Sequence, residues 1–404
     1  MESRTYPFGL RYSVKLHEAA NPLALVRDMG AGFASHDDQR NSLTVRDISE
    51  AGEIKSSYVP ETETYDIELQ LDGKKFQIDV GGLSRIATII FGNQFRHEQI
   101  EWVRLLDIEF SPQIASIFGG PSLGNLGMRS FLKKESEPIF SFPMPIQIET
   151  DDKDALLREL IINNISIITE SPLGNTSISQ IKRLSEFLED ICDQYGKKIV
   201  YFFNGTMELP ELEKYALALK ELTSEKVMFG FRLCPLSMGL NTTVWVRNLG
   251  LPIYGYNLLT VGSKQYGYEM SPRAMAILFR MAGCDLVNIG LKYQAIKNKS
   301  SAAEFVSSCI KRVDSIKETL PMFTGGITPR VCYEIVSQFG LTAGFHIKKP
   351  ILRDSIKTIK RNMLAYHESV QIALSQIELD EAIGRESRDT SHIRSYENDY
   401  RRGK

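Results

Sequence analysis

Residues 198–232 carry the sequence KIVYFFNGTMELPELEKYALALKELTSEKVMFGFR. Two short apolar runs, 198–204 and 226–232, have the length and the aromatic and β-branched content of buried strands. Between them, residues 211–222 place apolar side chains at the spacing of a helix that buries one face. A strand, a helix and a second strand in this order predict one unit of a parallel α/β sheet.

The same alternation of strands and helices fills the second half of the chain. Helical patterns occupy residues 177–196, 211–222, 271–283 and 301–313, and a last helix is expected from about Asp354 to Leu379. Eight units of this kind predict a closed TIM (β/α)8 barrel. The eight strand candidates are residues 139–147, 165–170, 198–204, 226–232, 251–257, 285–290, 320–326 and 341–347.

The first 137 residues have a different pattern. Residues 10–16 alternate as a half-buried strand does, and DIELQLDGKKFQIDV (66–80) predicts a hairpin with Asp72-Gly73 in its turn. The predicted fold class is α/β, with an N-terminal α+β ferredoxin-like domain followed by a TIM barrel. We place the domains at 1–137 and 138–380. The polar tail, 381–404, is expected to be disordered because it has few apolar groups to offset the entropy of ordering.

The composition argues against several classes of protein. The 404 residues include 48 Lys and Arg against 50 Asp and Glu, a net charge of −2, which gives no sign of a nucleic-acid or membrane-surface binder. No apolar run approaches the roughly 18 residues that a membrane helix needs. The five cysteines form no CxxC pair, and the first residues lack the apolar segment of a signal peptide. We therefore expect a soluble, reduced, cytoplasmic protein.

Several motifs resemble the large subunit of RuBisCO. They are the Gly92-Asn93 pair, the Leu-x-Asp-x-x-x-x-Pro run at Leu105–Pro112 and Phe118-Gly119-Gly120-Pro121, in the family's order. Further matches follow at YFFNGT (201–206), AGCDLVNIG (282–290) and FTGGI (323–327). The chain is thus similar to RuBisCO-like proteins over most of its length. This resemblance implies a homodimer, with active sites between the N-terminal domain of one subunit and the barrel mouth of the other.

The resemblance breaks at the family's metal site. In the family, one barrel strand ends in a Lys-Asp-Asp-Glu quartet that holds Mg²⁺, whereas LIINNISIITESP (160–172) ends here in Thr169-Glu170-Ser171-Pro172. Thr, Ser and Pro do not supply the anionic oxygen donors that Mg²⁺ prefers. The family's two catalytic lysines correspond to Met144 and, approximately, Ala295. We therefore predict no metal site, no cofactor and no fixation of CO₂.

Polar residues are nevertheless expected at the barrel mouth, Arg232 among them. The resemblance matches one phosphate clamp of the family to Asn257, Asn288 and Thr324, and part of its glycine-rich second phosphate site to Gly325-Gly326. The candidates for acid and base are His346, Glu170 and Lys292. The candidate substrate-binding residues are Asn93, Asn204, Asn257, Asn288, Thr324, Gly325, Gly326 and Lys348.

Each candidate has a plainer interpretation. Polar residues gather at any strand end that faces water, most lysines are simply solvated, and a histidine inside an apolar strand often belongs to the core. Tyrosines such as Tyr254 and Tyr256 more often fill a barrel than stack on a ligand.

Two functions remain open at this point. The first is metal-independent proton transfer, an enolisation or isomerisation, on a small sugar-derived or carbonyl substrate. The second is a catalytically inactive family member that serves as a dimeric ligand-binding or scaffold protein. A cluster of convergent titratable groups at the mouth would favour the enzyme, and an apolar or filled mouth would favour the scaffold.

Overall fold

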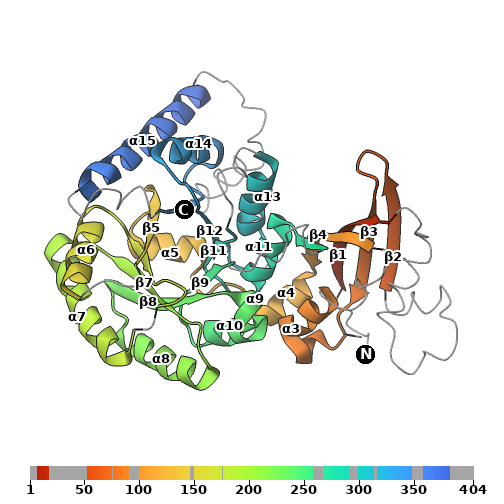
Figure 1. Ribbon diagram of the computed structural model, residues 1–404, viewed down its shortest axis with the longest axis horizontal. Helices are drawn as coiled ribbons and strands as arrows, with labels where there is room; N and C mark the ends of the chain where they lie inside the picture. The colour runs from red at the N-terminus through yellow and green to blue at the C-terminus, as the bar shows by residue number, and fades with distance from the viewer. Residues whose placement is uncertain are drawn as a thin grey trace.

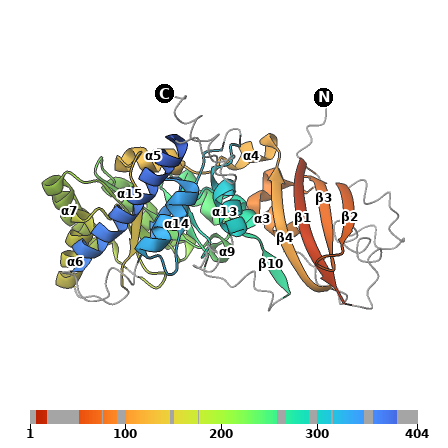
Figure 2. The ribbon, with the colours of Figure 1, turned by 90° about the horizontal axis from the view of Figure 1, so that it is seen from above.

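The computed structural model of the chain describes residues 7–17, 52–74, 76–90, 100–145, 150–174, 176–257, 267–290, 299–313, 316–347 and 358–382. A five-stranded sheet lies beside a closed barrel of eight parallel strands (Figures 1 and 2). The predicted combination of an α+β N-terminal domain and a TIM barrel is therefore confirmed.

All eight strand candidates take part in the barrel. Around the barrel the eight strands follow one another in the order of the sequence, and the last strand pairs with the first to close the ring. Most strands are shorter than predicted, and the first ends at Pro143, two residues before Pro145, which has no N–H for a ladder. The strands are β5 (Ile139–Pro143), β6 (Ile167–Thr169), β7 (Ile199–Asn204), β8 (Val227–Leu233), β9 (Ile253–Tyr256), β11 (Leu286–Asn288), β12 (Leu320–Phe323) and β13 (Gly344–His346).

Helices follow the strands, and several begin at clear capping signals. Ser177 and Gln180 form a capping box at α7, while Ser271 and Thr328 cap α11 and α14 just before a proline. The last helix extends to Ala382, two residues beyond the predicted end of the barrel domain, and residues 383–404 of the tail lie outside the described residues. The helices are α5 (Gly124–Leu132), α6 (Thr150–Ile162), α7 (Ile178–Tyr195), α8 (Leu209–Leu222), α9 (Pro235–Met238), α10 (Leu240–Asn248), α11 (Pro272–Met281), α13 (Lys299–Ile310), α14 (Pro329–Phe339) and α15 (Ile359–Ala382).

The N-terminal sheet has the strand order β4-β1-β3-β2, which fits the predicted ferredoxin-like domain. The hairpin predicted in residues 66–80 is wrong. Asp72 ends β3 and accepts the N–H of Lys74 at 3.0 Å, and the chain then enters a helix instead of a second strand. The strand that does pair with β3 is β2. The elements are β1 (Pro7–Leu16), β2 (Gly52–Val59), β3 (Thr64–Asp72), α3 (Ile78–Ile90), β4 (Ile100–Phe110) and α4 (Pro112–Phe118).

A strand from the barrel half completes this sheet. β10 (Tyr268–Met270) pairs in parallel with β4 at the sheet's edge, as Figure 2 shows, and the sequence did not predict it. Directly after it, Ser271 N and Oγ donate to the carbonyls of Leu105 at 2.8 Å and Leu106 at 2.6 Å. Arg273 then pairs with Asp107 at 2.7 Å. The sheet and the barrel are thus joined by backbone and side-chain contacts.

The barrel interior is filled at one end and polar at the other. Met128 and Leu132 of α5 pack with Ile139, Ile167 and Leu320, which lie at the amino ends of their strands. Helix α5 therefore closes the amino-terminal end, and the carboxyl ends of the strands form the open mouth. No helix in the described part of the chain is long and apolar enough to cross a membrane.

Candidate functional site at the barrel mouth

Arg232 is the central charged group of the mouth. It extends inward from β8, is 8% exposed, and lies with its guanidinium carbon 4.4 Å from the ring centre of Tyr256 and 5.9 Å from that of Tyr254. Its Nη1 donates to the carbonyl of Glu170 at 2.6 Å. Within the described part of the chain, it pairs with no carboxylate, and its Nε has no hydrogen-bond partner. Burial lowers the pKa of Arg232 from its usual value, but a guanidinium stays charged in proteins.

His346 also lies next to Tyr254. The ring centres of Tyr254 and His346 are 5.8 Å apart, and Nδ1 of His346 is 2.9 Å from Oγ of Ser141 on β5. The neighbours of His346, Phe345 and Ile347, pack in the outer core, so the histidine faces the barrel interior as its position in the strand suggests. Strands β8, β9 and β13 therefore bring a cation, an aromatic ring and an oriented imidazole close together.

Glu170 has a different environment. Its carboxylate accepts the N–H of Asn204 at 3.0 Å and the hydroxyl of Thr176. The amide of Asn204 in turn donates to the carbonyls of Pro172 at 2.9 Å and Gly174 at 3.0 Å. These bonds fasten the loop after β6 to the end of β7. In this arrangement Glu170 and Asn204 stabilise the rim of the mouth.

We expect burial of the Glu170 carboxylate to destabilise the folded protein more at high pH than at low pH, and Glu170→Gln to remove this cost. Burial raises the pKa of Glu170 above 4.5, although bonds from Asn204 and Thr176 offset part of the shift. A raised pKa in the folded state means that the folded protein prefers the protonated carboxyl group. This group's contribution to the stability of the original protein is therefore complete below the unfolded-state pKa and is lost as the pH rises through the folded-state pKa. The stability of Glu170→Gln relative to the original protein should therefore increase with pH.

Urea unfolding at about pH 4 and about pH 8 measures this difference. The exposed Glu211→Gln is the control, because its side chain faces solvent beside Lys214. A relative stability of Glu170→Gln that is constant or falls with pH would show that burial does not dominate at Glu170.

The residues matched to the family's phosphate clamps also lie at the mouth. The Asn288 amide donates to the hydroxyl of Tyr254 at 3.1 Å and accepts the N–H of Gly290 at 3.0 Å. After β12, Gly325 and Gly326 are exposed with φ of 76° and 77°, a left-handed backbone that favours glycine. Thr324 is half-buried beside them, and the N–H of Asn257 donates to the carbonyl of Asn288 at 3.0 Å. Asn93, Lys292 and Lys348 lie outside the described residues.

The end of β6 does not fit the family's Mg²⁺ site. The hydroxyl of Thr169 is buried without a hydrogen-bond partner among the described residues, and the neighbouring Glu170 carboxylate already accepts two internal hydrogen bonds. Residues 7–382, where described, contain no group of three or more His, Cys, Asp or Glu side chains that could hold a metal ion. Met144, at the position of a family lysine, is buried.

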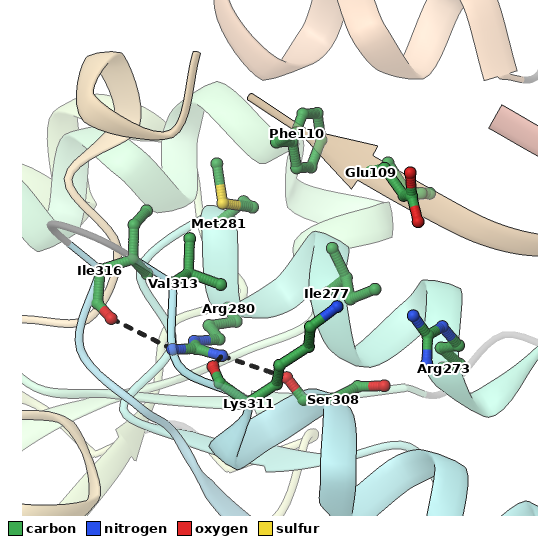
Figure 3. A pocket seen from close by; sticks show the side chains of 11 residues that line it. Glu109, Phe110, Arg273, Ile277, Arg280, Met281, Ser308, Lys311, Val313 and Ile316 are labelled. Atoms are coloured by element: carbon green, nitrogen blue, oxygen red, sulfur yellow. Dashed lines mark hydrogen bonds between the residues drawn. The ribbon is translucent and has the colours of Figure 1, made fainter. Parts of the chain in front are cut away.

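A cavity of about 310 Å³ lies away from the mouth, at the junction of β4, α11 and α13 (Figure 3). Its basic side chains include Arg280, which donates to the carbonyls of Ser308 at 3.2 Å and Ile316 at 3.1 Å. The same guanidinium donates to the carbonyls of Lys311 and Lys317. Arg280 thus satisfies the carboxyl end of α13, and we assign this cluster a structural role.

The sequence placed Arg232 among the polar residues of the mouth but gave it no role in catalysis or binding, and it did not single out Ser141. Each is a single polar residue inside an otherwise apolar strand, IFSFP (139–143) or VMFGFRL (227–233). Residues two positions away in each strand face the barrel interior, so Ser141 and Arg232 are expected to face it as well. That alternation is the signal that could have identified them.

The chain is similar in sequence to several enzymes whose activities are known. The chain is 26% identical over 65% of its length to a 3-oxo-isoapionate-4-phosphate transcarboxylase/hydrolase from Xanthobacter autotrophicus, of which it covers 66%. It is 23% identical over 64% of its length to a ribulose bisphosphate carboxylase from Thermococcus kodakarensis, of which it covers 64%. It is also 26% identical over 59% of its length to a 2,3-diketo-5-methylthiopentyl-1-phosphate enolase from Bacillus pumilus, covering 61% of that enzyme. The chain is thus similar, over about two thirds of its length, to enzymes of the RuBisCO large-subunit family.

Solved structures of this family share the fold. A dimeric archaeal RuBisCO from Hyperthermus butylicus superimposes with a TM-score of 0.76 at 19% identity, covering 96% of this chain and 95% of that one. A RuBisCO-like protein from Alicyclobacillus acidocaldarius gives a TM-score of 0.73 at 14% identity, covering 94% and 97%. No family model matches the chain. The relatives thus include RuBisCO-like proteins as well as carboxylases.

Proposed function

We propose that this RuBisCO-family chain is an enzyme that transfers a proton next to a carbonyl group of a small, phosphorylated, sugar-derived substrate, without fixing CO₂. The observation that carries the proposal is the buried Arg232. Within the described part of the chain Arg232 has no counter-ion. Burying such a charge costs several kcal/mol, and one carbonyl bond and two aromatic rings offset only part of that cost. An anionic group on a ligand would complete the site.

His346 supplies the proton acceptor in this proposal. In the tautomer whose Nδ1–H donates to Ser141 Oγ, Nε2 carries the lone pair that can accept a proton. Nε2 takes the proton from the carbon beside the carbonyl, the C–H electrons form a C=C bond, and the carbonyl oxygen becomes an enolate. Arg232 stabilises this negative charge, and the proton returns from the imidazolium to the oxygen or to a neighbouring carbon.

The substrate class follows from the relatives. The names of the Xanthobacter and Bacillus enzymes both describe phosphorylated compounds with a ketone. The backbone of Gly325 and Gly326 and the Thr324 hydroxyl are suited to the phosphate. Asn93, Asn257, Asn288, Lys292 and Lys348 complete the proposed substrate contacts, and Asn93 would come from the partner subunit of a homodimer. Dimeric and octameric RuBisCO structures among the neighbours support assembly of this kind.

The proposal excludes carboxylation because the donors at Thr169–Pro172 do not fit the family's metal site, and Met144 replaces a lysine. The purified chain should not incorporate labelled CO₂ into ribulose bisphosphate in the presence of Mg²⁺. Incorporation at the rate of a carboxylase would overturn this part of the proposal.

A ligand-binding or scaffold role is the alternative, and one observation favours it. Glu170, Asn204 and Asn288 all use their side chains in internal hydrogen bonds. Binding of a phosphorylated ketone without proton exchange would support this second function.

We expect Arg232→Met to weaken binding of 2,3-diketo-5-methylthiopentyl 1-phosphate by roughly 10- to 100-fold, because a charged hydrogen bond is worth about 1.5–3 kcal/mol. The free variant should be as stable as the original protein or more stable, since it removes a buried charge that has no counter-ion among the described residues. Calorimetric titration and urea unfolding measure the two effects.

Arg158→Met is the matched control. Arg158 also lies over an aromatic ring, that of Phe187 at 5.8 Å, but on the outer helices. Equal affinity of Arg232→Met and Arg158→Met, or no binding by the original protein, would contradict the proposed role of Arg232.

A further inference from the structure

We propose a second anion site at the closed end of the barrel, for inorganic phosphate or a small phosphate ester. A cavity of about 240 Å³ lies where the chain leaves α5 and where it enters β6 and β7. This is the amino-terminal end of the barrel, opposite the mouth.

The cavity carries a concentrated positive charge. Its described lining has four lysines, Lys133, Lys134, Lys197 and Lys198, against one carboxylate, Glu137. Lys134 pairs with Glu137, so an excess of three positive charges remains. Lys198 lies over the ring of Phe131 at 5.2 Å, and Lys133 has no ion pair among the described residues. Like charges gathered around a concave site repel one another, and an anion between them removes that repulsion.

The hydroxyl of Ser166 is a second observation in favour of a ligand, and it does not depend on the charges. Ser166 lines the cavity, is 3% exposed, and its Oγ has no hydrogen-bond partner among the described residues. Buried hydroxyls in proteins nearly always have a partner. A phosphate oxygen in the cavity would accept this hydrogen bond, while the lysines neutralise the charge.

The polar neighbours of the cavity are consistent with this assignment. Lys197 Nζ donates to Asn164 Oδ1 at 2.6 Å, which holds the ammonium group at the cavity. On α15, His367 has its pKa lowered first by burial and then by Lys134, with Lys197 acting in the same direction and Glu137 against it. The positive potential of the lysines therefore extends beyond the lining itself.

The size of the cavity decides the class of ligand. A volume of about 240 Å³ is below the range of roughly 300–1,000 Å³ typical of sites for drug-sized molecules. Inorganic phosphate and phosphate esters of short sugars share the same dianionic group and are small enough. Comparing the affinity of the cavity for inorganic phosphate with its affinity for a sugar phosphate distinguishes these two ligands.

Calorimetric titration of the full chain with inorganic phosphate, and separately with ribose 5-phosphate, tests the site. The double variant Lys197→Met/Lys198→Met should bind the better ligand at least about tenfold more weakly, because two charge-assisted contacts are lost. Ser166→Ala should also bind more weakly while remaining as stable as the original protein without ligand, since it loses a hydroxyl that has no partner. Tighter binding of the sugar phosphate would identify an ester, and tighter binding of phosphate the free ion.

Two controls separate this site from others. Lys226→Met changes a lysine in the equivalent position before β8, where Lys226 pairs with Asp193 and does not line the cavity. Arg232→Met changes the mouth. Both should retain the affinity of the second site. Undiminished binding in the double lysine variant, loss of binding in Arg232→Met alone, or no binding by the original protein would overturn the assignment.

Discussion

Arg280→Met is expected to lower the free energy of unfolding by roughly 3–5 kcal/mol, because it leaves buried carbonyl groups without their hydrogen-bond donor. Arg280 extends from α11, is 3% exposed, and donates to four carbonyls, those of Ser308, Lys311, Ile316 and Lys317. Two of these carbonyls belong to the last turn of α13 or follow it directly. They have no partners within the helix, so the guanidinium is their substitute.

Methionine retains the length and the apolar stem of arginine but has no donors. Each buried carbonyl left without a partner costs about 1–3 kcal/mol, and relaxation or water entering the adjacent cavity recovers part of the sum. The exposed Arg330→Met, which removes only a helical pair with Glu334, should cost less than about 1 kcal/mol. Urea unfolding of both variants measures the difference. Similar losses for Arg280→Met and Arg330→Met would disprove the structural role given to Arg280.

His346→Asn is expected to slow proton exchange by roughly 10²–10⁴-fold, the usual contribution of a positioned acid or base. Asparagine can still reach Ser141 but cannot take up a proton. NMR detection of deuterium entering 2,3-diketo-5-methylthiopentyl 1-phosphate from heavy water measures the exchange directly. The exposed His17→Asn should exchange at the original rate.

Ser141→Ala tests whether the histidine must be oriented. Ser141 contacts Nδ1 of His346, so it is a positioning residue, and its loss should reduce the rate less than loss of the imidazole and shift the pH profile of exchange. A rate for His346→Asn equal to that of the original protein would falsify the assignment of the base. Binding without exchange in the original protein would favour the scaffold.

The barrel could be predicted from sequence because its signal is local. Each strand is a short, fully buried run, and each helix has its own apolar face and, in several cases, a capping residue such as Ser177. The failed hairpin shows the limit of this reasoning. Asp72-Gly73 is good turn chemistry, but a turn does not determine whether the following residues become a strand or a helix; the buried face of α3 does.

The candidate site was harder to predict because it depends on contacts between distant strands. The position of His346 in β13 indicates that it faces inward, but not that Ser141, 205 positions earlier, lies 2.9 Å away. Glu170 was selected as a titratable residue at the end of a barrel strand, and its bonds to Asn204 and Thr176 became visible only in three dimensions. The pairing of β10 with β4 was unpredictable for the same reason, since a three-residue strand carries little periodicity.

The pairing of β10 with β4 also has a consequence for the time course of synthesis. β4 ends at Phe110 and β10 begins at Tyr268, so about 160 residues separate the edge of the N-terminal sheet from the strand that covers it. At roughly 5–20 residues per second, that edge waits about 8–30 seconds on the ribosome before its partner exists. An open edge strand is a template for pairing with other chains. The emerging N-terminal domain is therefore most prone to aggregation until β10, which follows the fifth barrel strand, has been made.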